Sequence, residues 1–334
     1  MERLFVRSLI AALMASLLIV TATADVPETT YETISVARPG GELYGTVTIP
    51  KKIPDSKATK VPVVLIISGS GPTDRDGNSR LLPGHNNGLK QIAEALTDKG
   101  YATVRYDKRG VAASLAAGPK EGDLRFDTYV EDAAAWISLL EQDSRFSSVV
   151  VVGHSEGALI GMLAARQTGG VAGFISVAGP ARRASDVLRS QLASLPSSIV
   201  AANERVLASL EKGIAVQDVP PELNALYRST VQPYLISWFR YVPRDELARL
   251  KMPVLIIHGG TDIQVSESEA VLLKKAKPDA KMVVIAGMNH VLKTVPSDRS
   301  RQIESYSDPS LRISADLTTE LQKFVQEVTK TTAD

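Results

Sequence analysis

Ser155 lies at the centre of a five-residue motif, GHSEG at residues 153–157. The motif matches G-x-S-x-G and stands between an apolar run at 149–152 and a helical pattern at 158–166. In a strand–turn–helix context it predicts a nucleophile elbow, in which a strained turn raises the serine hydroxyl above the edge of a sheet. The alternative, a tight turn with an incidental serine, does not need this flanking strand and helix. Because a serine hydroxyl is a weak nucleophile, a base must take its proton.

His290 is predicted to be that base. It is one of four histidines and follows the last apolar run of the chain, in GMNH at residues 287–290. A loop at this position presents its side chains at the carboxyl edge of a parallel sheet. Of the other three, His154 is expected to point into the fold, His258 to be structural or a neighbour of the acid loop, and His85 to lie in a polar loop that is exposed or rims the site.

Asp262 is predicted to orient the histidine. It ends the segment GGTD at residues 259–262, directly after another apolar run. A carboxylate there can accept a hydrogen bond from one imidazole nitrogen and leave the other for the serine. The chain order Ser155, Asp262, His290 suits a triad on an α/β scaffold. Two alternatives remain open, Asp107 after the run that ends at residue 106, and Glu267 at the start of a predicted helix.

Backbone N–H groups are expected to hold the oxyanion of the tetrahedral intermediate. One should be the N–H of Glu156, the residue after the nucleophile. The second should come from the loop SGSGP at residues 68–72, with the N–H of Ser70 preferred and that of Gly69 next. The alternative for a glycine-rich loop is a phosphate cradle, but the chain lacks the lysine and hydroxyl spacing of a P-loop and also lacks G-x-G-x-x-G.

Short apolar runs that alternate with helical patterns must position these residues. The runs have no polar alternation, as in strands covered on both faces. They predict a mostly parallel sheet with helices on both faces, an α/β class. An alternating segment at 32–50 with glycines at 40 and 41 predicts an antiparallel hairpin before it. The apolar runs span residues 63–67, 101–106, 148–152, 173–177, 254–257 and 282–285.

The strand pattern is interrupted between residues 181 and 250. Helical patterns at 184–195 and 203–212 replace it and predict a helical cap inserted after the sixth strand. We therefore divide the chain into a signal peptide (1–24), a first core part (25–180), the cap insertion (181–250) and a second core part (251–334).

Three segments of the chain resemble a known group of enzymes, the bacterial α/β-hydrolase carboxylesterases that carry the loop motif G-S-G-P-x-D-R-D-G. The resemblance rests on SGSGPTDRDGN at 68–78, RYDKRG at 105–110 and GHSEG at 153–157. It implies the α/β-hydrolase fold and hydrolysis of short-chain acyl esters without a metal or organic cofactor. It also implies an ion-paired scaffold role for Asp74, Arg75 and Asp76. The charges of DKRG at 107–110 themselves predict a structural loop with internal ion pairs, which favours Asp262 over Asp107 as the acid. One departure is VAAS at 111–114, where a glycine is more usual at position 112.

Composition excludes several function classes. The chain of 334 residues has no cysteine, which excludes disulfides, thiolate metal sites and a cysteine nucleophile. Its net charge of +1 does not favour nucleic acid as a partner. Arg3 and Arg7 precede an apolar run at 8–20 and the small-x-small sequence ATA at 22–24, which predicts cleavage before Asp25 and export to the periplasm or medium. The run is shorter than a membrane span, so no stable span is expected after cleavage.

The sequence thus predicts a serine carboxylesterase whose partner is a small-molecule ester. A peptidase or aminopeptidase and a thioesterase are alternatives on the same fold, and a non-catalytic binding protein is a third. The natural ester, the acyl length and the oligomeric state are not predicted by the sequence.

Overall fold

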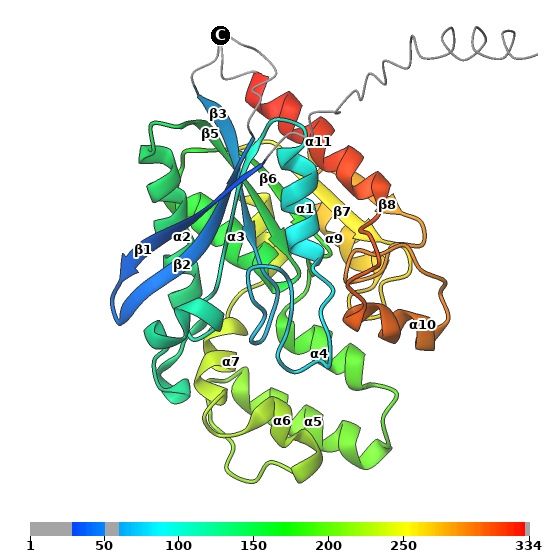
Figure 1. Cartoon of the computed structure of the whole chain (residues 1–334). Coiled ribbons are helices and arrows are strands. Elements are labelled where there is room, and N and C mark those ends of the chain that lie inside the picture. The colour runs from blue at the N-terminus through cyan, green and yellow to red at the C-terminus, as the bar shows by residue number, and fades with distance from the viewer. Residues whose placement is uncertain (1–28, 51–59, 331–334) are drawn as a thin grey trace, which may run out of the picture.

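The computed structural model describes residues 29–50 and 60–330. These residues form an eight-stranded sheet in the order β1-β2-β4-β3-β5-β6-β7-β8 (Figure 1). β1 pairs with β2, and β2 with β4, in antiparallel register, and the remaining neighbours are parallel. The predicted mostly parallel sheet with an antiparallel hairpin is therefore confirmed. The strands are β1 Thr30–Arg38, β2 Gly41–Ile49, β3 Val61–Ile67, β4 Ala102–Tyr106, β5 Phe146–His154, β6 Val171–Val177, β7 Val254–Gly259 and β8 Lys281–Ile285.

The central strands are apolar throughout because helices cover both faces of the sheet. In β3, Val63 and Leu65 pack into one hydrophobic cluster, and Val64 and Ile66 pack into the other. Helices α1 and α11 contribute to the second cluster, whereas α2, α3 and α9 contribute to the first. The helices are α1 Gly88–Thr97, α2 Phe126–Gln142, α3 Glu156–Thr168, α4 Ala184–Leu192, α5 Ser197–Leu210, α6 Asn224–Tyr227, α7 Gln232–Trp238, α8 Pro243–Ala248, α9 Glu267–Ala276, α10 Arg299–Glu304 and α11 Ala315–Lys330.

Helices α4 to α8, called here the inserted helices, follow β6 and precede β7. They lie below the carboxyl ends of the parallel strands (Figure 1). Their apolar side chains, among them Val206 and Tyr227, join the same cluster as α2 and α3. The interval predicted to be a helical insertion thus contains helices, while the division of the chain into domains stays a prediction.

The predicted signal peptide lies outside the described residues. Within the described part of the chain, no helix is both long and apolar enough to cross a bilayer.

Candidate active site

Ser155 occupies a sharp turn between β5 and α3. Its backbone has φ 55° and ψ −122°, a left-handed conformation that is strained for a residue with a side chain. The turn is possible because two glycines flank it. A Cβ on Gly153 would lie 2.3 Å from the carbonyl oxygen of Gly157, and a Cβ on Gly157 would lie 2.4 Å from that of Ile67. The geometry is that of a nucleophile elbow.

Asp262 and His290 lie against each other at the ends of neighbouring strands. Asp262 follows β7 and His290 follows β8, and the two strands are paired in parallel. His290 Nδ1 lies 2.7 Å from Asp262 Oδ2, and the side chains are only 6% and 0% exposed. With Nδ1 donating to the carboxylate, Nε2 is the nitrogen left for a serine proton.

The charge of His290 and several hydrogen bonds keep the carboxylate of Asp262 in its ionised form. Burial raises the pKa of Asp262, but the charge of His290 and its hydrogen bond lower it, as do the backbone N–H groups of Val265 and Gln264. The net result is a pKa below the ordinary value. Asp262 therefore stays charged at neutral pH despite its burial, as an acid that orients histidine requires.

The loops that carry Asp262 and His290 are tied together by backbone contacts. The Thr261 N–H and hydroxyl both donate to the Met288 carbonyl, at 3.1 and 3.0 Å. A Cβ on Gly259 would lie 2.1 Å from that same carbonyl oxygen, so glycine permits the close approach. His258 is fully buried, and its Nε2 donates to the Val265 carbonyl at 2.8 Å. His258 therefore braces the acid loop, one of the two roles predicted for it.

A cavity of about 160 Å³ brings these parts together. Ser155, His290, Gly69 and Ser70 all line it. The predicted nucleophile, the predicted base and the loop at 68–72, called here the oxyanion loop, thus line one cavity. A Cβ on Gly69 would lie 3.2 Å from the Cβ of Ser155, so the oxyanion loop lies directly against the nucleophile. Glu156, whose N–H is the other predicted donor, begins α3 and has no helical acceptor for that N–H.

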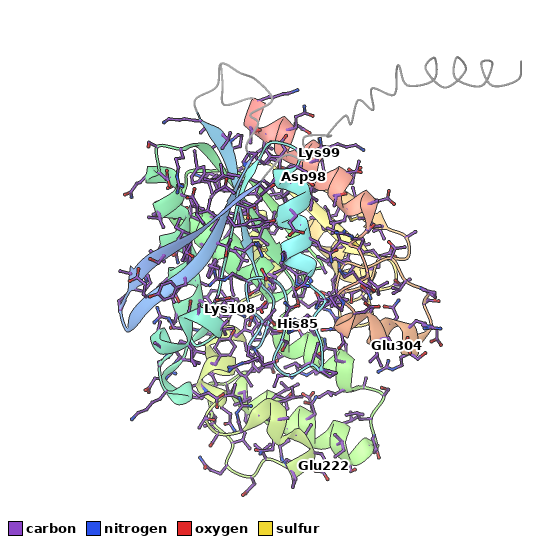
Figure 2. All side chains as sticks on the ribbon, in the orientation of Figure 1. His85, Asp98, Lys99, Lys108, Glu222 and Glu304 are labelled. Carbon is purple, nitrogen blue, oxygen red and sulfur yellow. The ribbon has the colours of Figure 1, made fainter. Side chains whose placement is uncertain are left out.

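His154 contacts the base loop in a way that the sequence did not reveal. It lines the same cavity, so the prediction that it points into the fold is only partly correct. Its Nε2 donates to the backbone carbonyl of His290 at 2.8 Å, and the two rings lie 5.0 Å apart. His85, which is labelled in Figure 2, lies in the polar loop before α1. It is exposed and lines a neighbouring hollow.

The two alternative acids have other surroundings. Asp107 is buried and accepts from the backbone and guanidinium of Arg75, at 2.8 and 2.6 Å. Glu267 is exposed at the first position of α9, and neither residue lines the cavity of Ser155. The contacts favour Asp262 over both.

The expectation of internal ion pairs in the loop at 107–110 is wrong. Its charged residues each pair with another part of the chain: Asp107 with Arg75, Lys108 with Glu156, and Arg109 with Asp132. The loop therefore connects distant segments instead of stabilising itself.

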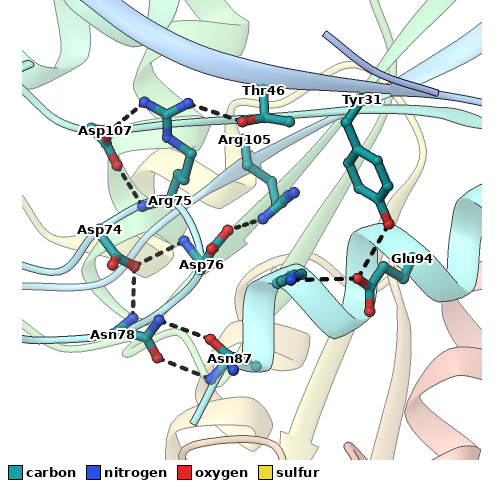
Figure 3. Close-up of polar contacts among 12 residues, drawn as sticks. Tyr31, Thr46, Asp74, Arg75, Asp76, Asn78, Asn87, Glu94, Arg105 and Asp107 are labelled. Atoms are coloured by element: carbon teal, nitrogen blue, oxygen red, sulfur yellow. Dashed lines mark hydrogen bonds and ion pairs between the residues drawn. The ribbon is translucent and has the colours of Figure 1, made fainter. Parts of the chain in front are cut away.

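Polar contacts fix the segment that follows the oxyanion loop (Figure 3). Arg75 bonds Asp107 and the Thr46 hydroxyl, and Asp76 pairs with Arg105. The carboxylate of Asp74 accepts from the N–H groups of residues 76 and 78. These contacts have the form expected of a scaffold for the oxyanion loop.

Ala112 has a φ of 42°, in the left-handed region that favours glycine. This is the position where the resembled group more usually has glycine. The alanine at position 112 therefore adopts a backbone conformation that is strained for a residue with a side chain.

No cluster of three or more histidine, aspartate or glutamate residues suited to a metal ion occurs in residues 29–50 and 60–330.

Sequence comparisons match the chain with an aminopeptidase family, an esterase and a chloroperoxidase. A family profile described as "Serine aminopeptidase, S33" matches residues 82–232, a range that holds Ser155 but neither Asp262 nor His290. Esterase EstD of Thermotoga maritima is 31% identical over 254 residues, which are 75% of this chain. The chain spans 58% of the length of that relative. A putative non-heme chloroperoxidase of Synechocystis is 27% identical over 246 residues, 63% of this chain and 82% of that protein.

Structure comparisons concern the fold alone, because identities are low. Est1E of Butyrivibrio proteoclasticus, solved with ferulic acid, superposes with a TM-score of 0.59 and 20% identity and covers 88% of this chain and 98% of its own. The α/β hydrolase GrgF of Penicillium superposes with a TM-score of 0.58 and 16% identity, covering 91% of this chain and 100% of its own.

Proposed function

This chain has the α/β-hydrolase fold, and from that premise we propose that it is a serine carboxylesterase acting on short-chain acyl esters. The observation that carries the proposal is the 2.7 Å contact between Asp262 and His290 in loops that meet the cavity of Ser155. The 31% identity to an esterase supports the same reaction class. The G-S-G-P-x-D-R-D-G loop further favours the carboxylesterase group that the motifs resemble.

In the proposed mechanism, the Ser155 hydroxyl attacks the ester carbonyl while His290 Nε2 takes its proton. Asp262 holds the imidazole by Nδ1 and stabilises the imidazolium. The N–H groups of Glu156 and Ser70 bind the oxyanion. His290 then returns the proton to the leaving alcohol. Water, deprotonated by the same nitrogen, releases the acid and regenerates Ser155.

The aminopeptidase alternative is less well supported, although the matched profile carries that description. Recognition of a free α-amino group requires a carboxylate near the nucleophile. Among the described residues that line the cavity of Ser155, none is an aspartate or glutamate. An uncharged wall suits an ester better than a protonated amine.

Activity of the Ser155→Ala variant tests the proposal. We expect purified wild type to hydrolyse p-nitrophenyl butyrate faster than aminoacyl anilides. Ser155→Ala should lower kcat by at least about 10³-fold because the nucleophile is lost, with unchanged circular dichroism. The control is Ser266→Ala, a serine that is exposed and does not line the cavity. Wild-type esterase activity in Ser155→Ala would refute the assignment, and a preference for anilides would favour the peptidase.

A further inference from the structure

Lys108 is a buried cation directly behind the nucleophile, and the mechanism above does not use it. Its side chain is 1% exposed and its Nζ lies 3.3 Å from Glu156 Oε2, which is itself on a side chain only 2% exposed. The same Nζ donates to the Gly69 carbonyl at 2.5 Å. It also lies 5.1 Å from the centre of the Tyr129 ring. Figure 2 shows Lys108 near the level where the sheet meets the inserted helices. One amine therefore contacts both segments from which oxyanion donors are expected.

The contact with Gly69 determines the direction of the neighbouring N–H. The Gly69 carbonyl and the Ser70 N–H belong to one peptide unit, which is planar and trans, so they point in opposite directions. Because the carbonyl points at Lys108, the N–H of Ser70 points away from it. Ser70 lines the cavity with Ser155. Among the described residues the Ser70 N–H has no hydrogen-bond partner, so it is available to a ligand.

The contact between Lys108 and the Glu156 side chain restrains the residue whose N–H is the other predicted donor. The Glu156 N–H begins α3, and its carboxylate is held on one oxygen by Lys108 and on the other by the Tyr234 hydroxyl of α7. A buried carboxylate bound on both oxygens has little freedom to move. The ion pair thus links the first residue of α3 to the amine that holds the Gly69 carbonyl.

We propose that Lys108 is a positioning residue of the oxyanion hole, which orients the Gly69–Ser70 peptide and holds it against the first turn of α3. The inference rests on the proposed function, because the oxyanion hole is assigned its role from the proposed acyl transfer. Tyr234 extends the same network to the inserted helices. Lys108 touches no substrate in this role and acts through the two N–H donors.

The test replaces the pair by neutral side chains, because removing Lys108 alone would leave a buried, unpaired carboxylate. For Lys108→Met/Glu156→Gln we expect kcat for p-nitrophenyl butyrate to fall about 100-fold, the loss typical of one oxyanion donor, with KM within about twofold. Phosphonylation of Ser155 by a fluorophosphonate, whose transition state uses the same hole, should slow by a similar factor. Glu156→Gln alone keeps the hydrogen bond from Lys108 to the Gly69 carbonyl. Its kcat and its phosphonylation rate should therefore fall less than those of the double variant.

The matched control is Lys277→Met. Lys277 is another buried lysine, 8% exposed, whose Nζ donates to a backbone carbonyl, that of Leu250, away from the cavity. We expect this variant to lower the melting temperature while kcat stays within about twofold of wild type. A merely structural role for Lys108 predicts the same pattern for both lysines.

Wild-type kcat and a wild-type phosphonylation rate in the folded double variant would overturn the inference. If that variant does not fold, Lys108→Met/Glu156→Met gives an apolar pair for the same measurement, with the same expected losses. Failure of the proposed function would look different. Wild type would then hydrolyse no ester, while the ratio of phosphonylation rates would still decide the role of Lys108.

Discussion

At the scale of single residues, His154 couples acid pH to the stability of the site. Burial, and to a smaller extent the neighbouring His290, lower the pKa of His154 from 6.5 to about 4, although the hydrogen bond to the His290 carbonyl acts in the opposite direction. The folded state therefore keeps this ring neutral where the unfolded chain takes up a proton. The contribution of His154 to the free energy of unfolding is fully present above pH 6.5. It is lost as the pH falls from 6.5 towards 4.

We expect His154→Gln to weaken this pH dependence. Glutamine can still donate to the His290 carbonyl but does not titrate. Between pH 7 and pH 5 wild type should lose roughly 2 kcal/mol of unfolding free energy through His154, and the variant should lack that component. Urea unfolding at both pH values measures it. The control is His85→Gln, which removes an exposed imidazole. Between pH 7 and pH 5 its unfolding free energy should change as much as that of wild type. An unchanged slope in His154→Gln would contradict the prediction.

Some features of single residues could not be predicted from the sequence. His154 and His290 are 136 positions apart, and Lys108 and Glu156 are 48 apart. Neither contact follows a local pattern, because each joins two segments that are far apart in the sequence. The charged loop at 107–110 was therefore predicted to pair internally, whereas its partners lie in other segments.

At the scale of elements, glycine determines whether the elbow can form. Helix α3 crosses so close to β3 that a Cβ on Gly157 would lie 2.4 Å from the Ile67 carbonyl and 2.6 Å from that of Ser68. The loop after β3 is also the oxyanion loop. A methyl group at Gly157 must therefore displace either the helix or this loop.

We expect Gly157→Ala to destabilise the fold by about 3 kcal/mol, a typical cost of overpacking, and to lower esterase activity in whatever protein remains folded. Urea unfolding and p-nitrophenyl butyrate hydrolysis measure both effects. Gly122→Ala is the control, because a Cβ there meets nothing within 4 Å and its φ is not positive. Equal stability of the two variants would contradict the close packing of the elbow.

Elements with strong local patterns were predictable. The apolar runs at 63–67 and 148–152 lie within β3 and β5, and α9 begins at Glu267 as expected. The short helices α7, α8 and α10 were not predicted. Each has seven residues or fewer, too few for a helical period to stand out, and their positions depend on packing against other elements.

At the scale of the whole molecule, the expectation of export concerns residues outside the described part. We expect production in a bacterial host to yield exported protein that begins at Asp25, because the ATA sequence at 22–24 fits signal cleavage. Intact-mass measurement of the periplasmic fraction and medium tests this. Ala24→Arg should block cleavage and is the control. A chain retained in the membrane with residues 1–24 attached would contradict the expectation.

Distant parts of the molecule also form a second, partly apolar hollow beside the cavity of Ser155. A hollow of about 550 Å³ shares Leu82, Gln264 and Tyr306 with the cavity of Ser155. Three segments far apart in sequence supply its exposed apolar side chains, Leu82, Ile263 and Ile303, at 39%, 41% and 55% exposed. An acyl chain that outgrows the inner cavity would therefore lie on this surface.

We expect Ile263→Ser to lower kcat/KM for p-nitrophenyl octanoate about fivefold to tenfold, while acetate hydrolysis changes by less than about twofold. The reason is that only a long chain reaches Ile263, and each buried methylene contributes about 0.8 kcal/mol. The ratio of the two rates is the measurement, which cancels any loss of folded protein. Ile214→Ser is the control, since Ile214 is 59% exposed and lines neither hollow. Equal losses of kcat/KM on the octanoate and acetate esters would contradict this prediction. The acyl chain would then lie away from the surface formed by Leu82, Ile263 and Ile303.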